Sequence, residues 1–388
     1  MISPLLLLVI GLVLVIGGIV WLRMHAFLAL ALAAFVVGSL TPTSYLERHF
    51  TEEKGESHQR AEVLAEESIG KRLADGFGRT CGKVGILIAM AAIIGTCLME
   101  SGAAMRIVRS SLSVFGEKRA PEAMAGSSFL LGIPVFFDTL FYLMVPLAKA
   151  LALQTKKNYL LYVLAIVAGG AMTHSLVPPT PGPLLVAGEL EVDLGRMIVG
   201  GLIVGSFGMA GAFAYARWYN GKYPMEVRSM DESDAGVFSK VAEIKEAQLP
   251  PLFFSLYPLA RPGLLIAGNS ILSQTSFESG DAFMVSFRNA IGFLGDKNLA
   301  LTMGAVLALW LLLRSPVSRG SQVGVAVRKS LKSAGTIILI TGMGGAFGGI
   351  LQQTSLGLDI RAFATSNELG SMAILLLAFF ATSSIRIA

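Results

Sequence analysis

The sequence predicts an all-α polytopic membrane protein with about ten apolar spans or half-helices, in two repeats that contain broken helices or re-entrant hairpins. Hydrophobic residues make up 54% of the 388 residues and charged residues only 15%, whereas soluble globular chains carry about 25% charged residues. Charged residues gather in short stretches between long apolar runs, as in chains that cross the bilayer repeatedly. A proline-rich interruption at residues 173–183 separates two of these runs.

A helix needs about 20 apolar residues to cross the hydrocarbon core. The candidate runs are Ile2–Leu22, Ala26–Leu40, Val84–Met99, Ser127–Ala148, Tyr159–Met172, Leu194–Ala216, Leu249–Leu272, Leu299–Leu313, Ala334–Leu351 and Ser371–Ala388. Some of them are short enough to be half-helices. No charged region precedes the first run and a second run follows closely, so we interpret it as a span and not as a signal peptide.

Polar stretches divide the chain into five parts. These are two N-terminal transmembrane helices (1–43), a polar cytoplasmic segment (44–83), a first transport repeat (84–217), a cytoplasmic loop (218–250) and a second transport repeat (251–388) that is incomplete at its C-terminus. The segment 44–83 carries charges of both signs, and we expect it to form solvated surface helix.

Orientation depends mainly on the stretch Arg314–Lys332, which contains five basic and no acidic residues and is therefore assigned to the cytoplasm. Counting back through the spans places Trp218–Gln248 inside, Ser273–Asn298 outside and Lys149, Lys156 and Lys157 inside. The same count places Ser101–Gly126 outside, although this stretch is rich in basic residues. An element between Val84 and Ala148 that enters the membrane and returns on the same side would remove the contradiction. Whether the chain crosses the membrane an odd or an even number of times in this region stays open.

An internal repeat is indicated by two similar segments. Gly95–Gly102 resembles Gly348–Ser355, 253 residues later, and each ends a glycine-containing apolar run that is followed by an arginine. Secondary transporters form their sites where two such repeats meet. The second copy stops at Ala388 within an apolar run, without a counterpart of the proline interruption. Either the protein ends inside a span or the chain is truncated, and we expect truncation.

The interruption Thr173–Pro183 ends any helix that enters it, because four of the six residues from Pro178 to Pro183 are proline. Irregular backbone at membrane depth occurs only where it is buried in protein or lines a water-filled cavity. The interruption is therefore either a substrate or ion site, or an ordinary proline-rich loop between two spans.

Two ionisable residues lie within apolar surroundings. Asp138 follows Pro134 in an apolar stretch, where an isolated carboxylate costs several kcal/mol or takes up a proton. We interpret it as a proton carrier; the alternative is a structural carboxylate that bonds to backbone freed by Pro134. His174 is the one histidine of four at membrane depth. It suits a proton relay or a hydrogen bond to substrate, or alternatively satisfies carbonyl groups of the broken helix.

The remaining candidates for substrate contact are mostly neutral hydrogen-bonding groups. The set is Thr173, Ser175, Thr180, Gly182, Glu100, Ser101, Gln352 and Gln353. Single hydroxyls in membrane helices often bond to their own turn, and Glu100 is equally suited to anchor a helix end at the interface. Arg261 could pair with a carboxylate substrate, but we favour a position at the surface beside Pro262, with the span starting later.

Several classes of protein are not supported by the sequence. The two cysteines, Cys81 and Cys97, lack the spacing of a metal or redox motif, so we expect no disulfide, metal or cofactor. The pI is about 9.2, but the basic residues flank spans, so nucleic-acid binding is not expected. The absence of HExxH and GxSxG motifs argues against a membrane-embedded hydrolase and against an enzyme generally. A passive channel or receptor remains an alternative.

Three motifs occur in the order Glu100–Gly102, Gly132–Asp138 and Thr173–Pro183. Together they resemble the gluconate permease (GntP) family of the ion transporter superfamily, and Ser384–Ala388 is similar to the family's repeat-two motif. The resemblance implies a multi-pass protein of the cell inner membrane that imports gluconate or a related sugar acid by proton symport. Some relatives carry other small carboxylates, including the amino acid D-serine. The implied partners are the sugar acid, protons and the lipid bilayer, and a homodimer is compatible with the superfamily.

Overall fold

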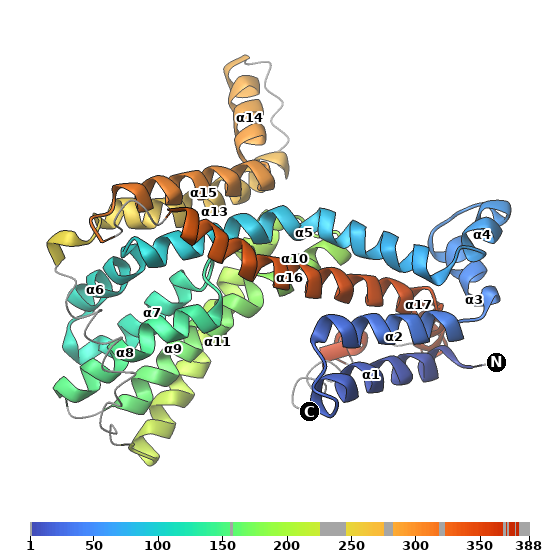
Figure 1. Ribbon diagram of the computed structural model, residues 1–388, viewed down its shortest axis with the longest axis horizontal. Coiled ribbons are helices and arrows are strands. Elements are labelled where there is room, and N and C mark those ends of the chain that lie inside the picture. Colours follow the sequence, from blue (N-terminus) through green and yellow to red (C-terminus); the bar gives the residue numbers. More distant parts are fainter. Residues whose placement is uncertain are drawn as a thin grey trace. The chain divides into compact units, whose positions relative to one another are not determined.

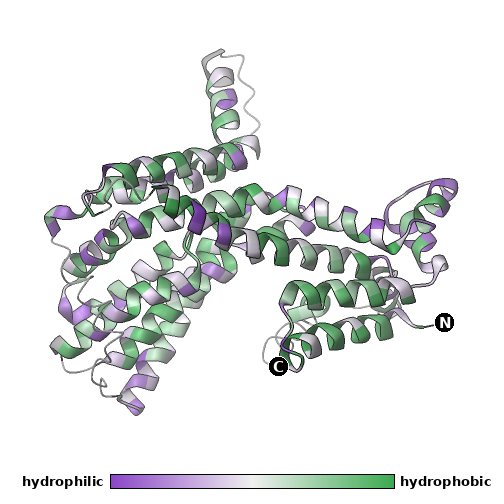
Figure 2. Ribbon diagram, viewed as in Figure 1, coloured by the Kyte–Doolittle hydropathy of each residue, from purple (hydrophilic) through white to green (hydrophobic). Residues whose placement is uncertain are grey.

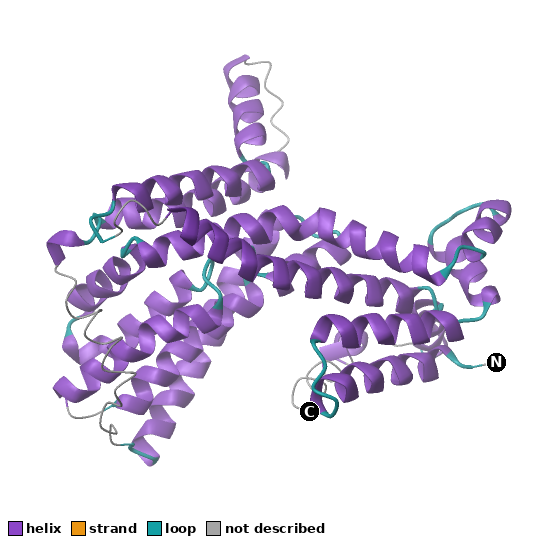
Figure 3. Ribbon diagram, in the orientation of Figure 1, coloured by secondary structure: helices purple, strands orange, loops and turns teal. Residues whose placement is uncertain are grey.

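The computed structural model describes residues 2–155, 158–225, 246–274, 282–317, 323–367, 370, 372–376 and 378–379, and these residues form helices joined by short loops (Figures 1 and 3). No strand occurs among them. Among these described residues, five helices are long and apolar enough to cross a membrane, or six if a bent pair counts as one crossing. The predicted class, an all-α polytopic membrane protein, is confirmed.

The chain forms two compact units. The first contains Met1–Cys81 and Leu339–Ala388, and the second contains Gly82–Ile338. Two long helices, α5 (Ile69–Glu100) and α16 (Val323–Gln352), contribute residues to both units. The other helices of the first unit are α1 (Pro4–Val20), α2 (Ala26–Leu40), α3 (Thr43–Arg48), a π-helical turn (His49–Glu53), α4 (His58–Ala65) and α17 (Leu356–Ser366).

Further α-helices among the described residues belong to the second unit. They are α6 (Ala103–Phe115), α7 (Ala120–Leu131), α8 (Phe137–Thr155), α9 (Tyr159–Leu176), α10 (Pro181–Glu189), α11 (Leu194–Lys222), α13 (Leu252–Gln274), α14 (Ala282–Leu294) and α15 (Lys297–Arg314). Within this unit α9 packs between α7 and α11, and α13 packs against α11 and α15 (Figure 1). Apolar residues run along most of α9 and α11, and hydrophilic residues are concentrated near the helix ends (Figure 2).

Helix starts follow from capping residues. Ser3 caps α1 by accepting a hydrogen bond from the amide of Leu6 at 3.2 Å, and Pro4 occupies the first helical position, where its missing N–H is not needed. Asp193 caps α11 and Asp296 caps α15 in the same way. In the second unit, these caps fix where α11 and α15 begin.

Two proline breaks interrupt the second unit. The prediction of Ser127–Ala148 as one run is wrong, because α7 ends at Leu131 and α8 begins at Phe137, with Pro134 between them. The interruption expected at Thr173–Pro183 is confirmed but is shorter, because α9 continues to Leu176 and α10 begins at Pro181. Proline lacks the donor that would continue the preceding helix, but its fixed φ suits the first turn of the next one.

Small residues bring the two broken helices together. A Cβ on Gly169 of α9 would overlap the backbone of Ala125 and Phe129 on α7. The Thr173 hydroxyl donates to the carbonyl oxygen of Phe129 at 2.8 Å, and Thr173 is fully buried. Phe129 lies in the last turn of α7, where carbonyls have no partner within the helix. Thr173 therefore caps one broken helix from the other.

We expect Thr173→Val to lower the free energy of unfolding by about 1–3 kcal/mol, because it leaves the Phe129 carbonyl without a partner in a buried position. Thr302→Val is the matched control, since among the described residues the Thr302 hydroxyl donates to the Asn298 carbonyl of its own helix and not to another helix. Thermal unfolding in detergent measures both variants. Equal midpoints would contradict the proposed capping.

The internal repeat is matched by local geometry. The helices α6 and α17 begin at Ala103 and Leu356, 253 residues apart as the sequence indicates, and the preceding residues Gly102 and Ser355 have left-handed φ angles of 79° and 61°. In the turns, the hydroxyl of Ser101 bonds to the Leu98 carbonyl and that of Thr354 to the Leu351 carbonyl. The two helix–turn–helix segments therefore share one construction.

Some expected boundaries fall inside helices. The boundary at Val84 lies within α5, which begins at Ile69, and Arg72 is buried at 9% exposure and not solvated as expected. Likewise α16 begins at Val323, so Lys329 belongs to a helix and not to a loop. Outside the described residues lie Lys156, Lys157 and Arg319, Ser384–Ala388, and residues 226–245 of the predicted cytoplasmic loop.

The contacts of the turn after α5 bear on which side of the membrane the stretch Ser101–Gly126 begins. A Cβ on Gly102 would lie 2.9 Å from Leu249 and 3.4 Å from Val317, and the Ser315 hydroxyl donates to the Ser101 carbonyl at 2.7 Å. Leu249 precedes α13 and Val317 follows α15, at helix ends that the charge pattern assigns to the cytoplasm. The start of the Ser101–Gly126 stretch thus lies on the same side as those ends, in agreement with its basic residues.

Candidate functional site

A polar cavity of about 250 Å³ lies between α5, α16 and the break that precedes α8. We call it the Glu100 cavity. Its lining residues are Ala92, Thr96, Met99, Glu100, Phe136, Thr139, Lys329 and Ser333. Cavities for drug-sized ligands measure about 300–1,000 Å³, so this volume suits a smaller molecule.

An ion pair and three hydroxyls give this cavity its chemistry. The Lys329 ammonium donates to a Glu100 carboxylate oxygen at 3.0 Å. Thr96 and Glu100 are four residues apart on α5, as are Lys329 and Ser333 on α16, so each pair shares one helix face. The two faces meet at the cavity, which can offer a cation, an anion and neutral hydrogen bonds to one ligand.

Asp138 and His174 adjoin this cavity. Thr139 lines it from the first turn of α8 and donates to the Asp138 carboxylate at 3.4 Å. Phe136 also lines it, and its ring meets the His174 ring edge-on, with centroids 6.4 Å apart. Asp138 lies close enough to His174 for an electrostatic interaction, and the buried His174 Nδ1 has no partner among the described residues. Glu100 therefore lines the cavity itself, whereas Asp138 and His174 contact residues that line it.

The predicted hydroxyls do not gather there. Thr173 and Thr180 are buried and donate to backbone carbonyls, Thr180 to Val177 at 2.7 Å. The buried Ser101 hydroxyl bonds to its own turn. These contacts correspond to the alternative of hydroxyls that satisfy local backbone. Ser175 is half-buried with a partner of its own, and Gly182 is exposed with open space beside it.

The repeat-two candidates lie in the first unit, at the end of α16. Gln353 accepts a hydrogen bond of 2.7 Å from the guanidinium of buried Arg72, whereas Gln352 is exposed. Gln353 corresponds to Glu100 at the separation of 253 residues. Each repeat therefore places a hydrogen-bond acceptor for a basic side chain at the end of its long helix.

The favoured surface position of Arg261, with a later start of the span, is wrong. The helix α13 begins at Leu252 and continues through Pro258 and Pro262. Arg261 is half-buried, with its guanidinium over the Tyr257 ring at 5.9 Å and 3.6 Å from the Met303 sulfur. The side chain is thus held within the helix packing.

A second cavity of about 250 Å³ collects the prolines of both breaks and of α13, and we call it the proline cavity. The prolines are Pro134, Pro178, Pro179, Pro258 and Pro262, and the other lining residues are apolar. A sugar acid would leave its hydroxyls without partners there. The cavity is therefore better suited to movement of the half-helices than to binding, because prolines remove the hydrogen bonds that keep a helix continuous.

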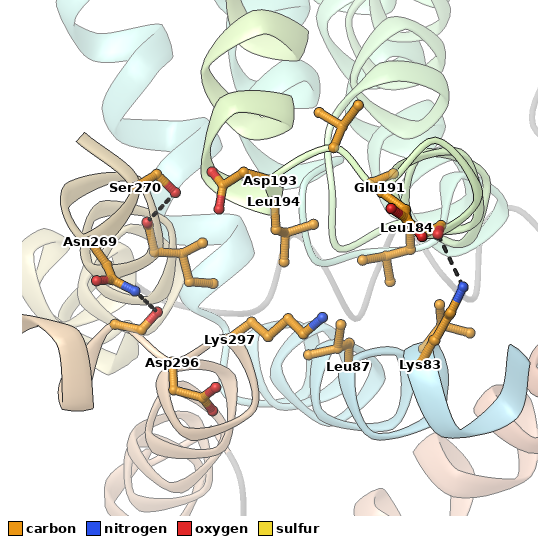
Figure 4. A pocket seen from close by; sticks show the side chains of 16 residues that line it. Lys83, Leu87, Leu184, Glu191, Asp193, Leu194, Asn269, Ser270, Asp296 and Lys297 are labelled. Atoms are coloured by element: carbon orange, nitrogen blue, oxygen red, sulfur yellow. Dashed lines mark hydrogen bonds between the residues drawn. The ribbon is translucent and has the colours of Figure 1, made fainter. Parts of the chain in front are cut away.

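A larger cavity of about 470 Å³ is bounded by α5, α13 and the starts of α11 and α15 (Figure 4). Lys83 donates to the Gly188 carbonyl at 3.1 Å, and Lys297 extends toward Leu87 (Figure 4). Its carboxylates are Glu191, Asp193 and Asp296. Three acidic against two basic side chains make this cavity less suitable for an organic anion than the Glu100 cavity.

Sequence reasoning missed Lys329, Thr96, Thr139 and Ser333. Lys329 was counted as one of the charges that set orientation. The signal that could have identified it is the spacing of four between Lys329 and Ser333, which repeats that of Thr96 and Glu100. Polar residues at this spacing share one face of a helix.

Known proteins resemble most of the chain. The sequence profile of the GntP family permeases matches residues 61–388. An uncharacterized permease of Haemophilus influenzae is 31% identical over 356 residues, which make up 90% of this chain and 68% of the relative. A gluconate permease of Pseudomonas aeruginosa is 29% identical, in an alignment that covers 97% of this chain and 77% of the relative. An inner membrane permease of Escherichia coli is 28% identical, in an alignment that covers 82% of this chain and 69% of the relative. No solved structure matches the chain.

Proposed function

The chain belongs to the GntP family permeases, and we propose that it imports gluconate or a closely related sugar acid by proton symport across the inner membrane. The name of the Pseudomonas aeruginosa relative supports the substrate class, and that of the Escherichia coli relative supports the membrane. The observation that carries the proposal is the Glu100 cavity. It combines an ammonium group with three hydroxyls beside a broken helix, as a polyhydroxylated carboxylate requires.

In this proposal the substrate lies in the Glu100 cavity, where its hydroxyls bond to Thr96, Thr139 and Ser333. The N-terminus of α8 faces the same cavity and favours an anion. Asp138 carries the proton, and His174 relays it or orients the carboxylate. Titratable groups that neighbour a membrane cavity commonly mark such proton paths. The half-helices around the proline cavity move as access alternates between the two sides.

Uptake of radiolabelled gluconate into membrane vesicles tests this function. We expect accumulation above the external concentration only with an inward proton gradient, and a proton ionophore should abolish it. Equilibration that is independent of the gradient would indicate a passive channel. If the vesicles take up another small carboxylate or D-serine and gluconate does not compete for that uptake, the substrate is a different one.

A further inference from the structure

The Glu100–Lys329 ion pair has the properties of an exchangeable contact. One ammonium–carboxylate bond of 3.0 Å joins the two side chains, of which Lys329 is 68% exposed and Glu100 37% exposed. Ion pairs of this exposure contribute little to stability. In a membrane protein, a charged group that is not covered by protein faces water or a water-filled path. The pair can therefore separate at small free-energy cost when another anion or a proton reaches the cavity.

Charge balance links a proton to a carboxylate ligand here. With Glu100 ionised and paired, the two groups sum to zero. A carboxylate ligand added alone would bring two anions to one cation, and a proton added alone would leave Lys329 without a counter-ion. Either addition alone leaves one charge at the cavity without a counter-charge. Adding a proton and a carboxylate together restores a sum of zero.

We propose that Lys329 is the anchor for the substrate carboxylate, and that protonation of Glu100 releases Lys329 to bind it. The proton adds to a Glu100 carboxylate oxygen, the Lys329 ammonium moves its hydrogen bond to the substrate carboxylate, and no covalent bond in the substrate changes. Loss of the proton re-forms the ion pair and expels the substrate. In this scheme the deprotonated form of Glu100 is the one that bonds to Lys329. This inference rests on the proposed function.

The other ionisable groups around the pair come from each neighbouring element. Cys97 on α5 is buried and interacts with Glu100. Asp138 on α8 adjoins Thr139, and His174 on α9 contacts Phe136. The α16 neighbours Arg328 and Lys332 are exposed, and α6 carries Arg106 beyond the turn. Glu100 is the one carboxylate among these that bonds to Lys329, so exchange is assigned to it. Asp138 and His174 are left to deliver the proton.

The second repeat provides a comparison within the same chain. At the position corresponding to Glu100 stands Gln353, whose amide oxygen accepts from Arg72 at 2.7 Å. An amide carries no charge and takes up no proton at physiological pH. The bond between Arg72 and Gln353 therefore does not respond to pH, and the proposed exchange is confined to the acceptor at the end of α5.

Gluconate binding to the full purified chain, measured by calorimetry between about pH 5 and about pH 8, tests the inference. Gluconate is ionised throughout that range, since carboxylic acids of this kind have pKa values of about 3.5. For wild type we expect affinity to fall as pH rises, by up to about tenfold per pH unit for one linked proton. Glu100→Gln should bind at all these pH values with little dependence on pH, and should exchange but not accumulate gluconate.

Lys329→Gln should weaken binding by at least about tenfold at every pH, and Lys329→Arg should restore part of it. Lys332→Gln and Glu66→Gln are controls of the same chemistry on exposed positions and should behave as wild type. Size-exclusion profiles of the variants check folding, and Lys329→Arg and Glu100→Gln still test the inference if Lys329→Gln misfolds.

Two results separate failure of this inference from failure of the proposed function. If wild type neither binds nor accumulates gluconate, the proposed function is wrong. If wild type accumulates gluconate while Lys329→Gln binds it with wild-type affinity, or Glu100→Gln keeps the wild-type pH dependence, the transport function stands and the exchange mechanism is overturned.

Discussion

Replacing Gly95 by alanine should remove nearly all gluconate uptake, whereas the same change at Gly82 should leave the wild-type rate. Both glycines lie on α5. A Cβ on Gly95 would lie 2.5 Å from the Pro134 carbonyl oxygen and 3.3 Å from the Val135 Cα, but nothing lies within 4 Å of one on Gly82. Because the obstacles at Gly95 are backbone atoms, no side-chain rotation removes the clash.

The expected loss comes from displacement of the break and not from unfolding. Overpacking of this kind costs about 1–3 kcal/mol, but the displaced backbone leads directly to Phe136 and Thr139, which line the Glu100 cavity. A shift of about 1 Å in positioning groups can lower a rate by about 100-fold. Initial uptake rates, normalised to folded protein in the membrane, give the measurement. Equal rates for the two variants would show that this contact does not position the cavity.

The sequence was sufficient to predict the all-α membrane class and the interruption after His174. Runs of apolar residues and consecutive prolines act locally, so both can be predicted without knowledge of tertiary contacts. Pro134 is a different case. A single proline is tolerated within a membrane helix when neighbours satisfy the freed carbonyls, as Pro146 within α8 illustrates. The break at Pro134 lies where α5 approaches closely at Gly95, a tertiary contact that the sequence does not show.

The candidate site was predicted less completely, because a residue type does not specify which way a hydroxyl or charge is directed. Thr173 and Thr180 were expected to meet substrate, yet both donate to backbone carbonyls at the breaks. Lys329 was interpreted as a cytoplasmic charge that sets orientation, yet it reaches Glu100, a residue 229 positions away in the chain. Neither direction follows from local patterns. Asp138 and Glu100 could be selected as candidates from the sequence because ionisable residues in apolar runs are few.

Asp138→Asn should abolish accumulation of gluconate but retain exchange of internal for external substrate. The Asp138 side chain is exposed at the start of α8, and the Thr139 hydroxyl donates to it at 3.4 Å. Asparagine keeps the size and an acceptor oxygen but carries no proton between the two sides. If Asp138 delivers protons to the Glu100 cavity, substrate can still bind and cross in exchange, because exchange needs no net proton movement.

Accumulation and exchange measured in the same vesicles distinguish this role from a structural one. We expect the internal concentration in Asp138→Asn to fall by about tenfold or more, to the external level, with exchange within about twofold of wild type. Asp75→Asn, an exposed carboxylate on α5, is the control and should accumulate normally. Loss of both activities would indicate that Asp138 holds the break together, since a structural carboxylate serves binding and transport alike. Retention of both would exclude Asp138 from the proton path and leave the Glu100–Lys329 pair as the group that couples protons to substrate.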